Sequence, residues 1–205
     1  MFKKRLFILG FVLIIILFVG CEADPPEEPA EKPVDEPEYG MGYVDDPLKV
    51  DGSSDGYPLD PLEEAGAVIH LAHDDQYIYV HLEAEVEGWV STGFNESGVG
   101  MDGANMVIGY LSGEEMPAFR DDVGSGRTHS EAGVTEVEAF HLARSDGVTV
   151  MEFSYPLNFS AEVDYNVEEI RPGEIYSLII AMHDSSDDID TKHSVRGMTD
   201  FQVQP

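Results

Sequence analysis

Two segments with the pattern of buried strands flank a glycine-rich loop, and this loop is the strongest candidate binding site in the sequence. Residues 89–94 (WVSTGF) and 105–110 (NMVIGY) are largely apolar, and the loop between them contains Met101. Loops held between buried strands present side chains at fixed positions. Gly100 and Gly103 on either side of Met101 allow a ligand to approach the backbone closely. Met101 is therefore the first candidate for contact with a ligand.

A second group of polar side chains gathers four carboxylates within residues 184–190 (DSSDDID). Hard cations such as calcium prefer oxygen ligands of this kind. The spacing does not follow the EF-hand loop, and an acidic loop in a very acidic protein is usually only hydrated. The sequence leaves open a calcium site or a solvated loop at Asp184, Asp187, Asp188 and Asp190.

Cysteine usage and motif content exclude several kinds of chemistry. Cys21 is the only cysteine, so the chain can form no intrachain disulfide, no cysteine-based zinc or iron–sulfur site and no covalent haem attachment through C-x-x-C-H. The sequence has no H-E-x-x-H pair and no phosphate-binding glycine loop. We therefore expect a binding protein and not an enzyme.

The N-terminus has the features of a secretory signal. Three basic residues precede an apolar run over residues 6–19, and the run ends in Gly20 and Cys21. Residues 17–21 (LFVGC) resemble the lipobox of bacterial lipoproteins, in which the cysteine is lipidated, although Phe18 stands where leucine is usual. The alternative is an uncleaved membrane anchor, for which the run is short. Either interpretation predicts an extracytoplasmic protein, and the first places it at the bacterial cell membrane through lipidated Cys21.

The composition divides the chain into three parts. Residues 1–21 form the predicted lipoprotein signal segment, and residues 22–47 are dense in proline and acid. Such a segment cannot bury enough surface to offset the entropy of ordering, so we expect an extended linker. Residues 48–205 have the size of one domain with a sizeable core.

The predicted domain consists of short alternating runs separated by turn residues such as Ser145-Asp146-Gly147. This pattern is typical of strands at regular spacing, and no long stretch has helical periodicity. We therefore expect an all-β fold, an antiparallel β-sandwich with immunoglobulin-like layers. The runs cover residues 67–71, 76–84, 134–142, 148–153 and 175–182, in addition to the two that flank Met101.

The chain is strongly acidic, with 41 acidic and 11 basic residues. Three of the basic residues lie in the signal segment, which leaves 41 acidic against 8 basic side chains, a formal charge of −33. Nucleic acid and anionic membrane surfaces are poor partners for such a surface. The acids are scattered, which favours the hypothesis of a high-salt habitat over a single binding patch. If stability proved independent of salt concentration, this hypothesis would lose its support.

Several motifs in order resemble the DOMON family of extracytoplasmic β-sandwich domains, which bind haem b or sugars. They are residues 88–94 (GWVSTGF), 101–110 (MDGANMVIGY), 147–157 (GVTVMEFSYPL), 176–183 and 193–197 (HSVRG), together with Val50-Asp51-Gly52 and residues 75–80 upstream. The resemblance covers nearly the whole domain, and its specificity comes from the order of the motifs.

The resemblance implies a pocket at one end of the sandwich. In the family's cytochrome members, non-covalent haem b is held there by one methionine and one histidine, and the matching positions are Met101 and His193. A thioether and a neutral imidazole leave no open position on the iron, which favours electron transfer. Lys192 and His183 remain alternatives for the second ligand. Aromatic residues that could line a haem or sugar pocket, or else belong to the core, include Trp89, Phe94 and Tyr110.

The sequence thus predicts a membrane-anchored haem b-binding domain that exchanges electrons with a separate redox partner protein. The alternative is a module that binds a carbohydrate or another small molecule at the same end of the sandwich.

Overall fold

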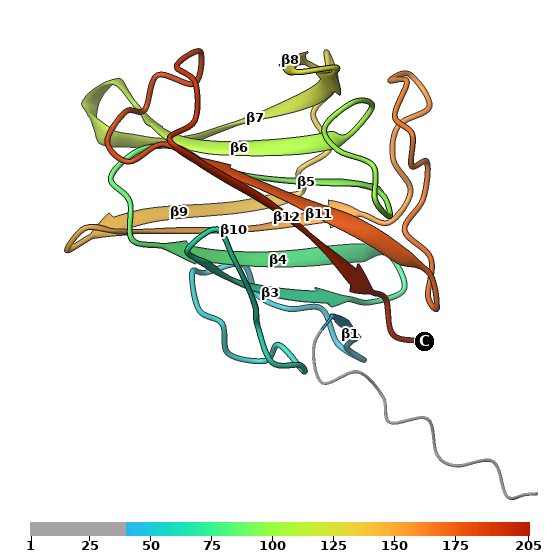
Figure 1. Ribbon diagram of the computed structural model, residues 1–205. Coiled ribbons are helices and arrows are strands. Elements are labelled where there is room, and N and C mark those ends of the chain that lie inside the picture. The colour runs from blue at the N-terminus through green and yellow to red at the C-terminus, as the bar shows by residue number, and fades with distance from the viewer. Residues whose placement is uncertain (1–39) are drawn as a thin grey trace, which may run out of the picture. The chain divides into compact units, whose positions relative to one another are not determined.

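The computed structural model describes residues 40–205, which form twelve strands and one short 3-10 helix (Figure 1). The elements are β1 (Met41–Tyr43), β2 (Leu62–Glu64), β3 (Ala67–His73), β4 (Tyr77–Ala84), β5 (Val90–Glu96), β6 (Asn105–Ser112), η1 (Gly113–Glu115), β7 (Met116–Ser125), β8 (Thr128–Glu131), β9 (Ala139–Ser145), β10 (Val148–Pro156), β11 (Ile175–Met182) and β12 (Val195–Gln202).

The strands form two sheets that pack as a sandwich. The first has the order β1-β3-β4-β10-β9, with β2 also paired to β3, and the second has the order β12-β11-β5-β6-β7-β8. All neighbouring strands are antiparallel except β1 and β3, which are parallel. Figure 1 shows β3, β4, β9 and β10 below the second sheet. The predicted all-β antiparallel sandwich is confirmed.

The core lies between the inner faces of the two sheets and follows the two-residue period of each strand. In β11, Tyr176, Leu178, Ile180 and Met182 belong to the main core. In the opposite sheet, Phe153 on β10 is fully buried. Burial of one large apolar side chain stabilises the fold by about 1.5–3 kcal/mol, so the alternation fixes which face of each strand points inward.

The sandwich begins earlier in the chain than residue 48, where the composition places its boundary. Met41 in β1 is fully buried and pairs with Leu71 of β3. The segment containing Met41 is dense in proline and acid, which is typical of a linker. Nevertheless, Gly42 fits against Pro58 so closely that a Cβ would overlap the proline ring. The predicted linker of residues 22–47 is therefore wrong at its C-terminal end.

The remaining N-terminal predictions fall on residues 1–39, outside the described part of the chain. They include the signal segment, the lipidation site Cys21 and most of the linker. Within residues 40–205, no helix is long and apolar enough to cross a membrane.

Buried Glu152 fastens the segment after β1 to the outer face of the first sheet. Its side chain on β10 accepts hydrogen bonds from the backbone N–H groups of Asp51 (2.7 Å) and Gly52 (2.6 Å) and from the hydroxyl of Tyr57 (3.2 Å). A Cβ on Gly52, whose φ is 88°, would overlap the His141 ring, so glycine is required there. This face of the sandwich is consequently closed.

The outer face of the second sheet is different, because apolar side chains gather there. Trp89, Ile108 and Ala181 form a buried cluster separate from the main core, and Tyr110 and Ile189 pack against it. In an antiparallel sandwich the outer face is ordinarily polar and hydrated. An apolar outer face indicates an interaction surface.

Neighbouring aspartates on β7 point to opposite sides of this sheet and have opposite pKa shifts. Asp121 faces the core side, where burial raises its pKa to about 6. One of its oxygens accepts the Glu136 N–H at 2.7 Å, and the other has no hydrogen-bond partner within residues 40–205. Burial also opposes ionisation of Asp122, but hydrogen bonds from His129 and Arg120 outweigh it and lower the pKa of Asp122.

We predict that Asp121→Asn stabilises the protein at pH 7 by about 1–3 kcal/mol. A carboxyl with a raised folded-state pKa contributes most stability below its ordinary pKa and loses it as pH rises through about 6, whereas asparagine does not titrate. Urea unfolding at pH 4 and pH 7 measures the difference, which should shrink at pH 4. Asp122→Asn is the control and should destabilise at pH 7. Equal effects of Asp121→Asn at both pH values would contradict the prediction.

Candidate functional site

A groove of about 880 Å³ lies over the outer face of the second sheet. Its floor comes from β6, β11 and β12, and its walls come from the β5–β6 loop, the β7–β8 turn and the β11–β12 loop. The volume is within the range of small-molecule sites. The residues that line it include Trp89, Met101, Met106, Arg127, His129, Ile179, Lys192, His193, Arg196 and Met198.

The floor of the groove is a row of apolar side chains across adjacent strands. Met198 pairs with Ile179, Ile179 with Gly93, and Gly93 with Met106. A Cβ on Gly93 would come within 2.9 Å of the Met106 side chain, so the absence of a side chain there makes room for that methionine. The floor can therefore contact a flat apolar ligand without a polar group that would need a partner.

Met101 is held at one wall by a buried amide and a close backbone contact. The Nδ2 of Asn95, which is fully buried, donates to the carbonyl oxygens of Gly100 (2.6 Å) and Asp102 (2.9 Å). On the other side, Gly124 of β7 packs so tightly that a Cβ would overlap the Met101 carbonyl oxygen. Both neighbours of Met101 are thus tied to the sheet, which fixes its position.

The β11–β12 loop, which carries His193, is fastened to the other end of the strands. Because β11 and β5 are antiparallel, this loop and the β5–β6 loop leave the sheet at opposite ends (Figure 1). Arg144 donates to both carboxylate oxygens of Asp187 (2.8 and 2.9 Å) and to the Gly88 carbonyl (2.7 Å). A planar guanidinium held in this way restricts the loop.

The environment of His193 favours a neutral imidazole. Burial, followed by the positive charges of Arg196 and Lys192, lowers the pKa of His193 below its ordinary value. A neutral imidazole can ligate a metal, whereas an imidazolium cannot.

Positive charge gathers at this groove although the protein is strongly acidic. Arg127, Lys192 and Arg196 line it, and none of them forms an ion pair with any acidic side chain of residues 40–205. Unpaired cations beside an apolar floor suit a ligand that is flat and apolar with anionic substituents.

The structure brings four of the predicted residues to this groove and leaves three outside it. Met101, His193, Lys192 and Trp89 line it. Phe94 lies in the main core against Phe159 and Phe201, and Tyr110 packs beside the Trp89 cluster without lining the groove. The Nδ1 of His183 accepts backbone N–H groups of Ser185 (3.2 Å) and Ser186 (3.0 Å) within its own loop.

The acidic loop does not assemble a calcium site. Asp187 is taken up by Arg144, and Asp188 Oδ1 accepts the Asp190 N–H at 3.1 Å. Nowhere in residues 40–205 do three or more His, Cys, Asp or Glu side chains converge as metal ligands. The expectation of calcium at Asp184, Asp187, Asp188 and Asp190 is therefore not supported, because Asp187 is paired with Arg144 and the four carboxylates do not converge.

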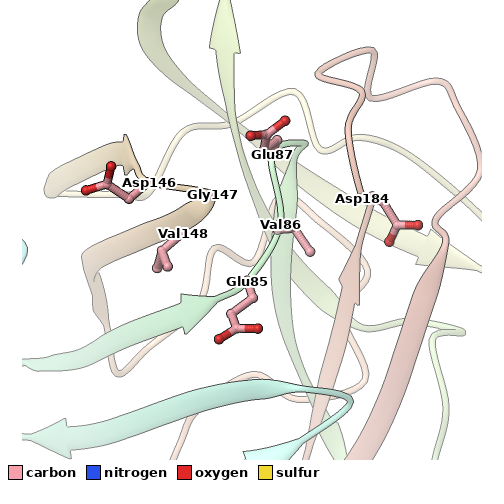
Figure 2. A pocket seen from close by; sticks show the side chains of 7 residues that line it. All are labelled: Glu85, Val86, Glu87, Asp146, Gly147, Val148 and Asp184. Carbon is pink, nitrogen blue, oxygen red and sulfur yellow. The ribbon is translucent and has the colours of Figure 1, made fainter.

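A second depression, of about 490 Å³, contains four carboxylates that also fail to converge. Figure 2 shows Glu85, Glu87, Asp146 and Asp184 around it, spread apart and pointing in different directions. Such a surface is hydrated and offers no common point for a cation.

The comparisons with known proteins agree with the fold and with the motif order. A model of the DOMON domain matches residues 65–183, more than half of the chain. This chain belongs to the DOMON family. The matched segment contains Met101 and ends before Lys192 and His193. A comparison with curated proteins gave no match.

The fold of this DOMON domain is similar to that of several solved structures. The cytochrome b domain of pyranose dehydrogenase from Coprinopsis cinerea has a TM-score of 0.51 at 10% identity, covering 67% of this chain and 76% of its own. The cytochrome domain of Myriococcum thermophilum cellobiose dehydrogenase has a TM-score of 0.49 at 11% identity, covering 73% and 78%. A family 9 carbohydrate-binding module from Caldicellulosiruptor kristjanssonii, in complex with glucose, has a TM-score of 0.44 at 10% identity, covering 76% and 83%. At these identities the similarity shows the fold alone.

Several groove residues of this DOMON domain were missed in the sequence. His129 belongs to β8, and Asp122, which is buried behind it and binds it, belongs to β7; the alternation pattern identified neither strand. Met106 and Ile179 were part of predicted strands, and their apolar neighbours Val107 and Ile180 occupy the core face. Continuous apolar runs in an antiparallel sheet signal that both faces are covered, and this signal was present in both strands.

We predict that Asn95→Ala destabilises the protein by about 2–3 kcal/mol and increases the mobility of the Met101 side chain. The substitution removes the donor of two hydrogen bonds and leaves two carbonyl groups without it. Urea unfolding and NMR relaxation of the Met101 methyl group measure the two effects. Asn158→Ala is the control, because Asn158 is exposed. An unchanged Met101 methyl signal would show that Asn95 does not fix the loop.

Proposed function

We propose that this protein is a haem b-binding electron-transfer domain in which Met101 and His193 are the axial ligands. The observation that supports the proposal best is that both side chains, which lie far apart in sequence, line one groove. The family includes haem-binding members, and a solved structure of similar fold is named as a cytochrome b domain.

The residues of the groove fit a haem in three respects. The floor of Met106, Ile179 and Met198 is apolar, which suits the hydrophobic edge of a porphyrin held between Met101 and His193 on opposite walls. The lowered pKa of His193 keeps its imidazole in the form that binds iron. When bound, the haem would supply a one-electron ferrous/ferric couple, and axial ligation by methionine and histidine favours electron transfer over oxygen chemistry.

The basic side chains at the groove give the haem carboxylates suitable partners. Arg127, Lys192 and Arg196 can bind the two propionates, and Asp190 is the one acidic side chain among the residues that line the groove. Charge-assisted hydrogen bonds of this kind also fix orientation. In a chain with a large excess of acid, this is a site selective for an anionic ligand.

Carbohydrate binding is the alternative function, and the groove favours it less. Trp89 is the single Phe, Tyr or Trp residue among the lining residues, and it is only 4% exposed. The floor therefore offers little aromatic surface and few polar groups for hydroxyls. Protein that remains colourless after expression with sufficient haem and after addition of haemin would favour the carbohydrate function.

We also propose that the domain is held outside the cytoplasm by lipidated Cys21, with residues after it acting as a tether. The basis is the signal-like composition of residues 1–21. A full-length Cys21→Ala protein should lose its membrane association and its lipid label in a fractionation with radiolabelled fatty acid. If the Cys21→Ala protein stays with the membrane and the wild type carries no lipid label, the result would point to an uncleaved anchor.

We predict that His193→Ala greatly weakens haem retention or converts bound haem to a high-spin form, because one axial ligand is lost. Absorption spectra of oxidised and reduced protein measure the change. His183→Ala, in the same loop, is the control and should have the wild-type spectrum, because its imidazole binds its own loop. Equal effects of both substitutions would contradict the assignment.

We predict that Met101→Leu lowers the reduction potential of the bound haem. Leucine keeps the approximate volume of methionine but has no sulfur, and thioether ligation raises the potential. A spectroelectrochemical titration measures the shift. Met116→Leu, at a 60% exposed position, is the control. A potential equal to that of the wild type would exclude Met101 as a ligand.

A further inference from the structure

We propose that His129 is an additional iron-ligating side chain of the groove, and that it occupies the axial position opposite His193 whenever the Met101 sulfur is not bound. This inference rests on the proposed haem function. It adds a residue from β8 that neither the sequence motifs nor the family match pointed to.

The first observation is the hydrogen bond that orients the imidazole. The Nδ1 of His129 makes a short hydrogen bond with Asp122 Oδ2, and this leaves Nε2 without a hydrogen-bond partner in residues 40–205. Histidines that bind metals characteristically donate their other ring nitrogen to a carboxylate, which fixes the tautomer and raises ligand basicity. His129 is thus prepared for ligation in a way that the structure shows for no other histidine of the groove.

The second observation is the burial of Asp122 itself. This carboxylate is completely buried, and Arg120 donates to its two oxygens at 2.5 and 2.6 Å. A buried ion pair is weak evidence for a stabilising role, because desolvation offsets most of the attraction. Since Asp122 faces the groove side of β7 and not the core, holding His129 in place is the role that its position explains.

The third observation places His129 on the same wall as Met101. His129 pairs with Gly124 in the β7–β8 ladder, and Gly124 is the residue against which Met101 packs. Directly paired strand residues have Cβ positions about 4.5–5.5 Å apart. His129, Met101 and His193 all line the groove. Met101 and His129 therefore approach the groove together, and His193 approaches it from the other loop.

Because Met101 and His129 lie on one wall, the bound haem would have two alternative ligation states with different reduction potentials. A thioether opposite imidazole raises the reduction potential, and a second imidazole in its place lowers it. The thioether and the imidazole differ in softness, so they differ in preference for the two oxidation states of iron. His129 would keep the haem six-coordinate when the methionine is absent or oxidised.

The test compares four haem-loaded proteins: wild type, Met101→Leu, His129→Gln and Met101→Leu/His129→Gln. Glutamine retains an N–H donor for Asp122 but lacks the imidazole nitrogen, so the buried carboxylate keeps a partner. We expect Met101→Leu to remain low-spin with a lowered potential, and the double variant to become high-spin. His129→Gln alone should keep the wild-type spectrum. Met101→Leu/His183→Ala is the matched control and should remain low-spin.

Electron paramagnetic resonance of the ferric proteins and absorption spectra distinguish the outcomes, and circular dichroism verifies that each variant is folded. Met101→Leu that is high-spin, like the double variant, would overturn the role of His129 while leaving the haem function in place. A double variant that stays low-spin would overturn it as well. Failure of the folded wild type to take up haem would instead overturn the proposed function, and this inference with it.

Discussion

The outer face of the second sheet carries apolar side chains that are unfavourable in contact with water. The rest of the site depends on this constraint. Met106, Ile179 and Met198 form an apolar row where a two-layer sandwich would ordinarily be hydrated. Within residues 40–205 this row stays accessible through a groove and is not closed by a loop. Glu152 provides the contrast in the first sheet, where the segment after β1 is tied down over the outer face.

The walls of the groove are positioned by polar contacts that are at least partly buried. Asn95 binds the carbonyl groups next to Met101, and Arg144 binds Asp187 in the loop that leads to His193. Neither contact touches the groove floor. The two loops therefore derive their positions from the sheet and not from a ligand, which is the arrangement that a preorganised binding site requires. Strand β7 contributes to both sides, with Asp121 toward the core and Asp122 toward the groove.

The sequence was sufficient for the fold class because strands such as β11 show the period of the sandwich directly. It also assigned Met101, His193 and Trp89 to one site, although His193 was found only through the order of the family motifs. Lys192 was an alternative to His193, whereas in the structure both side chains line the groove. The sequence failed for β1, a three-residue strand in which Met41 stands between Gly40 and Gly42, and for β8, whose polar residues resemble a turn. Phe94 and the Asp122–His129 pair show the deeper reason. Which face of a strand lines a site depends on how the strands pair across the sheet, and local periodicity does not predict that pairing.

The concentration of basic groups at one groove on a polyanionic protein has a kinetic consequence. A negatively charged ligand meets repulsion from most of the surface and attraction only near Arg127, Lys192 and Arg196. Screening reaches a length of about 10 Å at 0.1 M salt, so added salt weakens the distant repulsion more than the short contacts within the groove. Binding of an anionic ligand should consequently be faster at high salt than in dilute buffer, which is the reverse of the usual behaviour of a cationic site.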